Sequence, residues 1–274
     1  MTSLGSRSKA GVITAVTWIL VLLFFFPVFW MALNAFKSET DAASSTPLLF
    51  FSPDLESFQI VQDRGMTTYL INSLIAAGGA TIVILLLALP AAYALSIRPI
   101  KKVQDPLFFF ISTKFLPIAA VTLPLYMILK TIGYLDNIWA LVLIYAAINL
   151  PIAVWMLRSF LMEIPLEIIE AAQIDGANFF REFVRIVLPL ILPGLAAAGL
   201  ICFIFAWNEY FLATLLTSND ARTTPPFLGS FVDGRGQFLA VLSTAALIAA
   251  LPVIIAGWIA QKQLVRGLAL GAVK

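Results

Sequence analysis

Residues 66–97 read MTTYLINSLIAAGGATIVILLLALPAAYALSI and contain no Asp, Glu, Lys or Arg. An α-helix rises about 1.5 Å per residue, so about 20 apolar residues cross the hydrocarbon core of a bilayer. This stretch is longer than that, which allows a tilted span or an extended end. It decides the class of fold, because an apolar helix of this length belongs in a membrane.

Five further stretches have the same character. Four of them contain no charged residue and are each long enough to cross a bilayer. The fifth contains a single charged residue, Lys114. We expect an all-α integral membrane protein in which residues 1–274 form a single transmembrane domain of six helices. The expected spans are residues 11–35, 66–97, 106–129, 137–157, 187–217 and 237–261.

The composition of the whole chain agrees with this fold class. Hydrophobic residues make up 61% of the 274 residues and charged residues 12%, against about 25% charged residues in soluble domains. Such a composition excludes a water-soluble enzyme, a disordered chain and a nucleic-acid-binding protein. The sequence has no histidine and one cysteine, Cys202, which removes histidine-based catalysis and Cys/His metal cages. We expect no catalytic residue and no metal site.

The distribution of Lys and Arg predicts the orientation. Segments on one side of the expected spans (1–10, 98–105, 158–185 and 262–274) hold 11 of these residues, and the opposite loops hold 5. Basic residues concentrate on the cytoplasmic side of a membrane. We therefore expect both termini and the loop 158–188 in the cytoplasm of a bacterial cell, with the loops 37–64 and 218–235 outside the inner membrane.

The loop 158–188 and the start of the next span contain helical signals. Residues 164–193 read IPLEIIEAAQIDGANFFREFVRIVLPLILP. Pro165 suits the first turn of a helix, Gly176 suits the residue after its end, and Asn178 suits the cap of a second helix. Apolar residues follow at helical spacing, at Leu166, Ile169 and Ala172 and then at Phe179, Phe183 and Ile186. Two short helices joined by a tight turn either dock in a partner's groove or pack on the chain's own bundle.

These residues carry a resemblance to a known family. Glu170-Ala171-Ala172, Gly176 and then Ile186-x-Leu188-Pro189 resemble, at the family's spacing, the EAA loop in permease subunits of bacterial ABC importers. The resemblance covers nearly the whole chain and implies the type I importer permease fold. Further matches resemble the smaller permease of the maltose-type pair in the carbohydrate branch: Asn72-Ser73, Asp175-Gly176-Ala177, Trp207-Asn208-Glu209 and the tail 267–274. The sequences of residues 114–117 and 149–151 are similar to those of sugar-alcohol importers. Ser57-Phe58 departs from the Asn-Tyr pair that is usual in the family.

The resemblance implies a division of labour among several chains. Two separate ATP-binding subunits hydrolyse ATP with Mg, a second homologous permease completes the translocation path, and an extracytoplasmic solute-binding protein delivers the solute. This chain, which carries no G-x-x-x-x-G-K-[ST] phosphate-binding motif, is then not an enzyme and binds no cofactor itself. The residues implied in coupling to the ATPase are Glu170, Ala171, Ala172, Asp175, Gly176, Ile186, Leu188 and Pro189.

Two ionisable residues fall inside expected spans, Lys114 and Glu209. Intramembrane charges are expensive, so they mark either a functional path or a structural pair, and a lysine can also snorkel to the headgroups. Amide, carboxylate and aromatic groups suit a hydroxylated solute, although in the maltose-type pair the partner permease supplies most ligand contacts. The candidate path residues are Trp207, Asn208, Glu209, Tyr210 and Lys114.

Two other functional classes compete with an importer subunit. A proton-coupled secondary transporter would use Glu209 as its carrier, but it would need inverted repeats and broken helices, which the sequence does not display. A membrane-embedded enzyme would need a cluster of acids, bases or metal ligands at depth, and only Lys114 and Glu209 lie there. Small residues around Gly78-Gly79 favour close helix packing within the second span.

Overall fold

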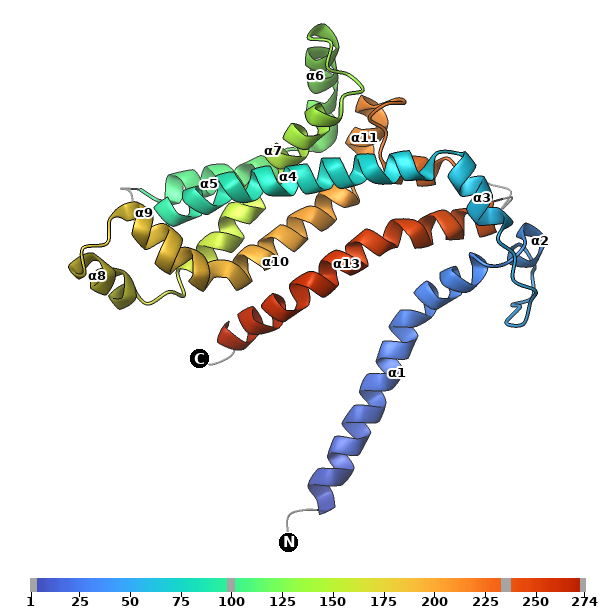
Figure 1. Ribbon diagram of the computed structural model, residues 1–274, viewed down its shortest axis with the longest axis horizontal. Helices are drawn as coiled ribbons and strands as arrows, with labels where there is room; N and C mark the ends of the chain where they lie inside the picture. The colour runs from blue at the N-terminus through green and yellow to red at the C-terminus, as the bar shows by residue number, and fades with distance from the viewer. Residues whose placement is uncertain (1–3, 98–101, 233–237, 272–274) are drawn as a thin grey trace. The chain divides into compact units, whose positions relative to one another are not determined.

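The computed structural model describes residues 4–97, 102–232 and 238–271, and across these ranges it contains helices and no strand (Figure 1). Arg98, Lys101, Arg235 and the tail 272–274, which were counted for the orientation and the resemblance, lie outside the described residues. The all-helical fold class is confirmed. Among the described residues, five helices are long and apolar enough to span a membrane, and six spans result if one bent helix pair is counted as a span.

The chain divides into two compact units, each of which is described by itself. The first comprises Met1–Met66 and Leu228–Ala250, and the second comprises Thr67–Phe227 and Leu251–Lys274. Helices α1 (Leu4–Asn34), α2 (Glu39–Ala42) and α3 (Glu56–Asp63) belong to the first unit, as does the beginning of α13 (Leu239–Gly271). The helices from α4 to α11 apart from Met66, the first four residues of α12 (Thr224–Gly229) and the remainder of α13 belong to the second.

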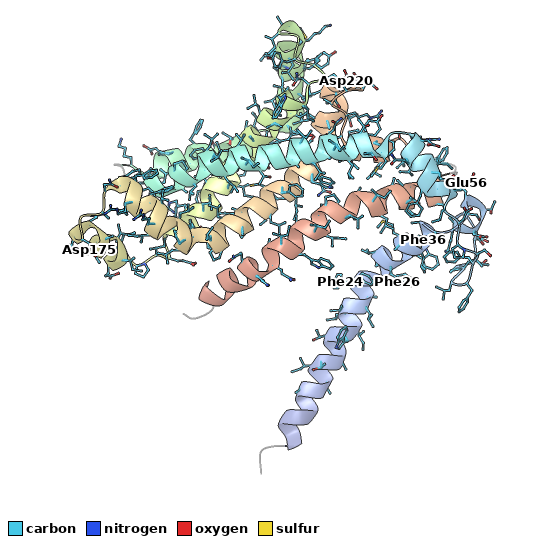
Figure 2. The ribbon with its side chains drawn as sticks, in the orientation of Figure 1. Phe24, Phe26, Phe36, Glu56, Asp175 and Asp220 are labelled. Carbon is cyan, nitrogen blue, oxygen red and sulfur yellow. The ribbon has the colours of Figure 1, made fainter. Side chains whose placement is uncertain are left out.

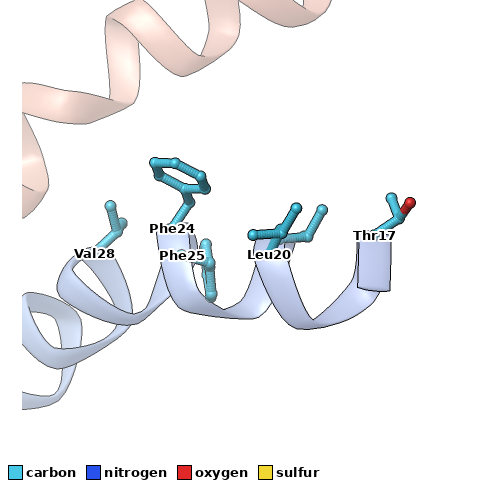
Figure 3. A pocket seen from close by; sticks show the side chains of 6 residues that line it. Thr17, Leu20, Phe24, Phe25 and Val28 are labelled. Carbon is cyan, nitrogen blue, oxygen red and sulfur yellow. The ribbon is translucent and has the colours of Figure 1, made fainter. Parts of the chain in front are cut away.

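Helix α1 exposes apolar side chains around its whole circumference. None of the residues in its membrane-spanning window is buried, and Phe24 is 79% exposed. Figure 3 shows Leu20, Phe24 and Val28 along one face, where they line a shallow hollow with Thr17, Val21 and Phe25. A helix that is apolar on every side is stable only against lipid or another hydrophobic surface.

Polar contacts fix the connection between α1 and α3 within the first unit. The carboxylate of Glu39 accepts hydrogen bonds from the backbone N–H groups of Ala240 and Val241 at the start of α13, at 3.1 and 3.3 Å. The Lys37 side chain is buried, donates to Asn34 Oδ1 at 2.9 Å, and places its ammonium 4.3 Å from the centre of the Trp30 ring. The cation is therefore stabilised by an amide oxygen and an aromatic face.

Three long helices make the core of the second unit: α4 (Met66–Ala94), α7 (Ile138–Leu161) and α10 (Leu188–Trp207). Glycine allows the closest approaches between them. A Cβ added at Gly194 of α10 would lie 2.5 Å from the Phe160 ring of α7, and one at Gly79 of α4 would lie 3.1 Å from Val142. The expected close packing is confirmed for Gly79, whereas Gly78 has open space beside it.

The third expected span is broken. Helix α5 (Gln104–Ser112) continues into a 3₁₀ turn (Thr113–Phe115), and α6 (Ile118–Thr131) then starts at 88° to it. Leu116 and Pro117 are extended, with ψ near 120°. Proline disfavours helical backbone in the residue before it, so Pro117 places the bend directly after Phe115, the neighbour of Lys114.

The fifth expected span, residues 187–217, is interrupted as well. Helix α10 ends at Trp207, and a short helix, α11 (Phe211–Leu216), follows after residues 208–210. Two of the expected spans therefore contain a break in the helix, and each break carries one of the two ionisable residues that the sequence places at depth: Lys114 and Glu209.

Candidate functional site

The EAA loop, residues 158–188, forms the two short helices that the sequence predicts. Helix α8 spans Leu166–Ile174, and α9 spans Phe179–Glu182. Gly176 has a φ of +76°, a left-handed backbone conformation that favours glycine. The backbone N–H of Ala177 donates to Ala172 at 2.9 Å, and the Asn178 side chain accepts from the N–H of Arg181 at 2.9 Å. The turn and both of its sequence signals are confirmed.

Helix α8 has one packed face and one free face. Ile169 and Ala172 are 3% and 7% exposed, while Glu170, Ala171 and Asp175 lie on the exposed side. Figure 2 shows Asp175 at the turn between α8 and α9. Leu166, expected on the packed stripe, is 58% exposed, so the first turn of α8 lies off the packed surface. Of the remaining predicted coupling residues, Ile186 and Leu188 are half-buried, and Pro189 and Gly176 are exposed.

The loop also contains a buried carboxylate that the sequence analysis missed. Glu182 is 0% exposed and accepts a hydrogen bond from the Tyr93 hydroxyl of α4 and another from Gln173 Nε2 of α8, the latter at 3.0 Å. The signal was present in the sequence: Glu182 lies directly before Phe183, on the apolar side expected for this helix. A π-helical turn, Phe183–Val187, follows it and leads into α10.

Three of the candidate path residues meet at the break between α10 and α11. Asn208 is exposed and its amide donates to the Ile204 carbonyl at 2.8 Å, and Tyr210 is 50% exposed. The Glu209 carboxylate accepts from the backbone N–H groups of Leu212 and Ala213, both at 3.0 Å, and so caps the start of α11. Trp207 is only 5% exposed and stacks on Phe203, and Lys114 lies at the other break, between α5 and α6.

Two buried hydroxyl groups accompany Glu209. The Tyr145 hydroxyl of α7 lies beside the Glu209 carboxylate and the Thr223 hydroxyl, and neither of these two hydroxyls makes a hydrogen bond of ordinary geometry with the described residues. Tyr145 is 1% exposed and Thr223 is 2% exposed. Buried polar groups of this kind have hydrogen-bonding capacity to spare.

A polar segment near residue 220 is held by α4 and by Asp136, both in the second unit. The Asn72 amide donates to the carbonyls of Asp220 and Arg222 at 2.8 and 3.0 Å, and the Ser73 hydroxyl donates to Thr224 Oγ1 at 2.9 Å. Asn72 and Ser73, which the resemblance singled out, therefore bind this segment to α4. Asp136, before the start of α7, holds it from the other side through the backbone of residues 218–221.

The sequence matches the family described as the binding-protein-dependent transport system inner membrane component over residues 84–269. The chain belongs to this family. A probable ABC transporter permease protein of Sinorhizobium fredii is 32% identical to it over 98% of both chains. The permease is also 32% identical to a diacetylchitobiose uptake system permease protein of Streptomyces coelicolor, over 96% of this chain and 95% of that protein.

A third relative and a solved structure agree with this assignment. The permease is 31% identical to a trehalose/maltose transport system permease protein of Thermococcus litoralis, over 93% of this chain and 94% of that one. Its fold matches a chain in the crystal structure of a bacterial ABC transporter that imports the acidic polysaccharide alginate, with a TM-score of 0.77 at 22% identity, covering 96% of this chain and 99% of that one. The chain is thus a multi-pass permease of the inner membrane, and this family consists of non-enzymatic channel subunits.

Proposed function

We propose that this permease is one half of the translocation path of an ATP-driven importer for a sugar or a sugar alcohol. The observation that carries the proposal is the similarity, over nearly the full chain, to permeases whose names specify trehalose/maltose and diacetylchitobiose uptake. The broken helices and the polar groups at their breaks suit a hydroxylated solute. None of the comparisons supports the proton-coupled alternative through Glu209.

The proposed assembly has four kinds of chain. This permease pairs with a second, homologous permease, two ATP-binding subunits hold ATP and Mg, and an extracytoplasmic solute-binding protein delivers the solute. In this proposal both termini and the EAA loop lie in the cytoplasm, which the excess of Lys and Arg on that side supports. The loops 37–64 and 218–235 then face the binding protein.

The EAA loop is the proposed contact with an ATP-binding subunit. Its free face presents the small side chain of Ala171, which allows close backbone approach, beside the carboxylate of Glu170 and the strongly exposed Ile174. The Gly176 turn braces α8 against α9, so a force on α8 moves both helices together. Closure of the ATP-binding subunits would thereby rock the membrane helices as rigid bodies.

The proposed solute path runs along the break between α10 and α11. The exposed side chains of Asn208 and Tyr210 contact the solute there, with Lys114 at the second break, while Trp207 and Glu209 hold the break in shape. The buried hydroxyls of Tyr145 and Thr223 add hydrogen-bonding groups close to it.

The test uses the complete transporter reconstituted in liposomes with its binding protein and a panel of maltose, trehalose and sorbitol. Wild type should accumulate one of these solutes when ATP is enclosed, and uptake should survive collapse of the proton gradient. Glu170→Lys combined with Gly176→Pro should abolish both uptake and stimulated ATP hydrolysis. Unchanged uptake in this variant would show that the EAA loop does not couple the two reactions.

A further inference from the structure

We infer that Glu182 is a positioning residue that joins the EAA loop to α4, so that movement of α8 is carried through Tyr93 along α4 to the segment 220–224. The inference rests on the proposed coupling role of the EAA loop and deepens it. It concerns three side chains, Gln173, Glu182 and Tyr93, which we call the clamp. All of its elements belong to the second unit.

The clamp ties three separate helices to one carboxylate. Gln173 lies on α8, two and three residues after the exposed Ala171 and Glu170, and donates to Glu182 Oε2 at 3.0 Å. Glu182 is the last residue of α9, and Tyr93 of α4 donates its hydroxyl to the other carboxylate oxygen. Each oxygen therefore serves a different helix, and α8 cannot shift relative to α4 without breaking a charge-assisted hydrogen bond.

Burial makes the hydrogen bond between Tyr93 and Glu182 expensive to lose, whereas Gln173 itself is exposed. Glu182 is 0% exposed and Tyr93 is 2% exposed. A buried carboxylate that loses a donor is left under-satisfied in a medium of low dielectric, which costs far more than the loss of an exposed hydrogen bond. The clamp therefore favours movement of the three helices together over separation of any one of them.

The hydrogen bond fixes the Tyr93 ring, because packing alone leaves room around it. The edges of Phe179 and Phe183 contact the ring at centroid distances of 5.6 and 5.3 Å. A mostly apolar cavity of about 160 Å³ adjoins the same rings and is also lined by Pro90 and Ala94. A ring bordered by open space can change its position unless a directional contact holds it, and Glu182 supplies that contact.

Helix α4 extends from the clamp to the segment 220–224. Its 29 residues at about 1.5 Å each make a rod of roughly 43 Å. Tyr93 lies in the last turn, and Asn72 and Ser73 lie near the start, where they bind the carbonyl groups and hydroxyl of residues 220–224. Both ends of one continuous helix are thus fixed by hydrogen bonds, one to the EAA loop and the other to the segment next to the break at Glu209.

The test removes the hydroxyl of Tyr93 and keeps its ring. In the complete transporter reconstituted in liposomes, Tyr93→Phe should lower the amount of solute imported per ATP hydrolysed by about tenfold, the size of effect that one buried, charge-assisted hydrogen bond can exert on an equilibrium. Recovery of the assembled complex should stay at the wild-type level. The matched control is Tyr69→Phe, which deletes a hydroxyl near the other end of the same helix and should leave the ratio unchanged.

Further variants of Glu182 and Gln173 identify Glu182 as the shared partner. Glu182→Gln keeps an acceptor for Tyr93 and can pair with a reversed Gln173 amide, so it should retain most of the coupling, whereas Glu182→Leu should lose it. Gln173→Leu combined with Tyr93→Phe should cost less than the sum of the two single changes on a logarithmic scale, because both act through one carboxylate.

The outcomes separate this inference from the proposed function. A normal import ratio in Tyr93→Phe, or a fall in complex recovery with the ratio unchanged, overturns the inference, since the clamp would then be structural only. Glu170→Lys reports on the proposed function independently, because it alters the free face of α8 and not the clamp. If Glu170→Lys impairs coupling and Tyr93→Phe does not, the EAA loop couples by another route.

Discussion

Asp136 and Ser218, which lie 82 residues apart in the sequence, make two hydrogen bonds with each other. The backbone N–H of Ser218 donates to Asp136 Oδ1 at 3.0 Å, and its hydroxyl donates to Oδ2 at 2.9 Å. The N–H groups of Asn219, Asp220 and Ala221 also donate to the same carboxylate, at 2.9 to 3.0 Å. One side chain thus holds four consecutive backbone groups.

We predict that Asp136→Asn destabilises the protein, because the amide replaces an acceptor oxygen with a donor. Asn tolerates the left-handed backbone of this position (φ 53°) as well as Asp does. The substitution therefore adds no backbone strain and changes only the charge and the hydrogen-bonding capacity of the side chain. In thermal unfolding of the detergent-solubilised complex, the free energy of unfolding should fall by roughly 1 to 2 kcal/mol, and solvent screening favours the lower value. Asp63→Asn, an exposed residue of α3, is the control and should have no effect; equal stability of the two variants would contradict the prediction.

The same carboxylate predicts a dependence of stability on pH. Partial burial opposes ionisation of Asp136, but the four backbone N–H groups outweigh it and hold its pKa well below the ordinary value. A group with a depressed pKa in the folded state stabilises the fold above its unfolded pKa, about 3.9 for Asp, and loses that contribution as the pH falls further. The stability difference between wild type and Asp136→Asn should therefore be constant above about pH 5 and shrink in more acidic buffer.

Gly194 and Phe160 predict the effect of a single methyl group on helix packing. Gly194→Ala places a Cβ 2.5 Å from the ring of Phe160, so α7 and α10 must separate or the ring must move. We expect the free energy of unfolding, measured by thermal unfolding, to fall by about 1 to 3 kcal/mol. Adding Phe160→Leu should restore part of this stability. Gly78→Ala, where nothing lies within 4 Å, should be tolerated. If these two alanine variants are equally stable, Phe160 does not limit the approach of α7 and α10.

Gly176 and Gly133 separate backbone strain from coupling. Both have a left-handed φ, +76° and +71°, with open space around the Cβ position. Alanine at either position should cost about 1 kcal/mol of stability. Only Gly176→Ala should also reduce the ATP-dependent uptake of the reconstituted transporter, because only that turn braces α8 against α9. A comparable loss of uptake in Gly133→Ala would point to general instability.

Glu209 and Asn208 should give opposite phenotypes. Glu209→Gln keeps one acceptor oxygen for the N–H groups of Leu212 and Ala213, so it should lower stability by about 1 kcal/mol with little change in the KM for solute uptake. Asn208→Ala removes an exposed amide that bonds only its own helix turn, and it should raise the KM with little loss of stability. Reversed phenotypes would place Glu209 on the solute path and Asn208 in the scaffold.

Much of the fold follows from local features of the sequence. The charge-free stretches predict the helices, and Pro165, Gly176 and Asn178 predict the two helices of the EAA loop, because caps and turns depend on residues a few positions apart. The breaks after Lys114 and at Glu209 were not predicted. Hydropathy averages over a whole span and does not register that Pro117 makes Leu116 extended.

The interactions that hold the site together depend on distant partners. Glu182 lies 89 residues from Tyr93, and Asp136 lies 82 from Ser218. The sequence gives the residue types but not these pairings, since they arise only when helices from separate parts of the chain pack together. The place of Glu209 on the solute path stays a prediction from its charge, whereas its capping of α11 through the N–H groups of Leu212 and Ala213 became visible only in the structure.

The turn of 88° between α5 and α6 determines how this subunit can exist in a cell. Peptide groups at the bend leave the helical ladder, and hydrocarbon offers them no partner, so this part of the chain cannot face lipid. Phe115, which is 81% exposed, and Lys114 next to it mark a flank that must be covered by another polypeptide or by water. We predict that a copy synthesised without the proposed companion chains leaves this surface uncovered and is degraded, so that its abundance should follow theirs.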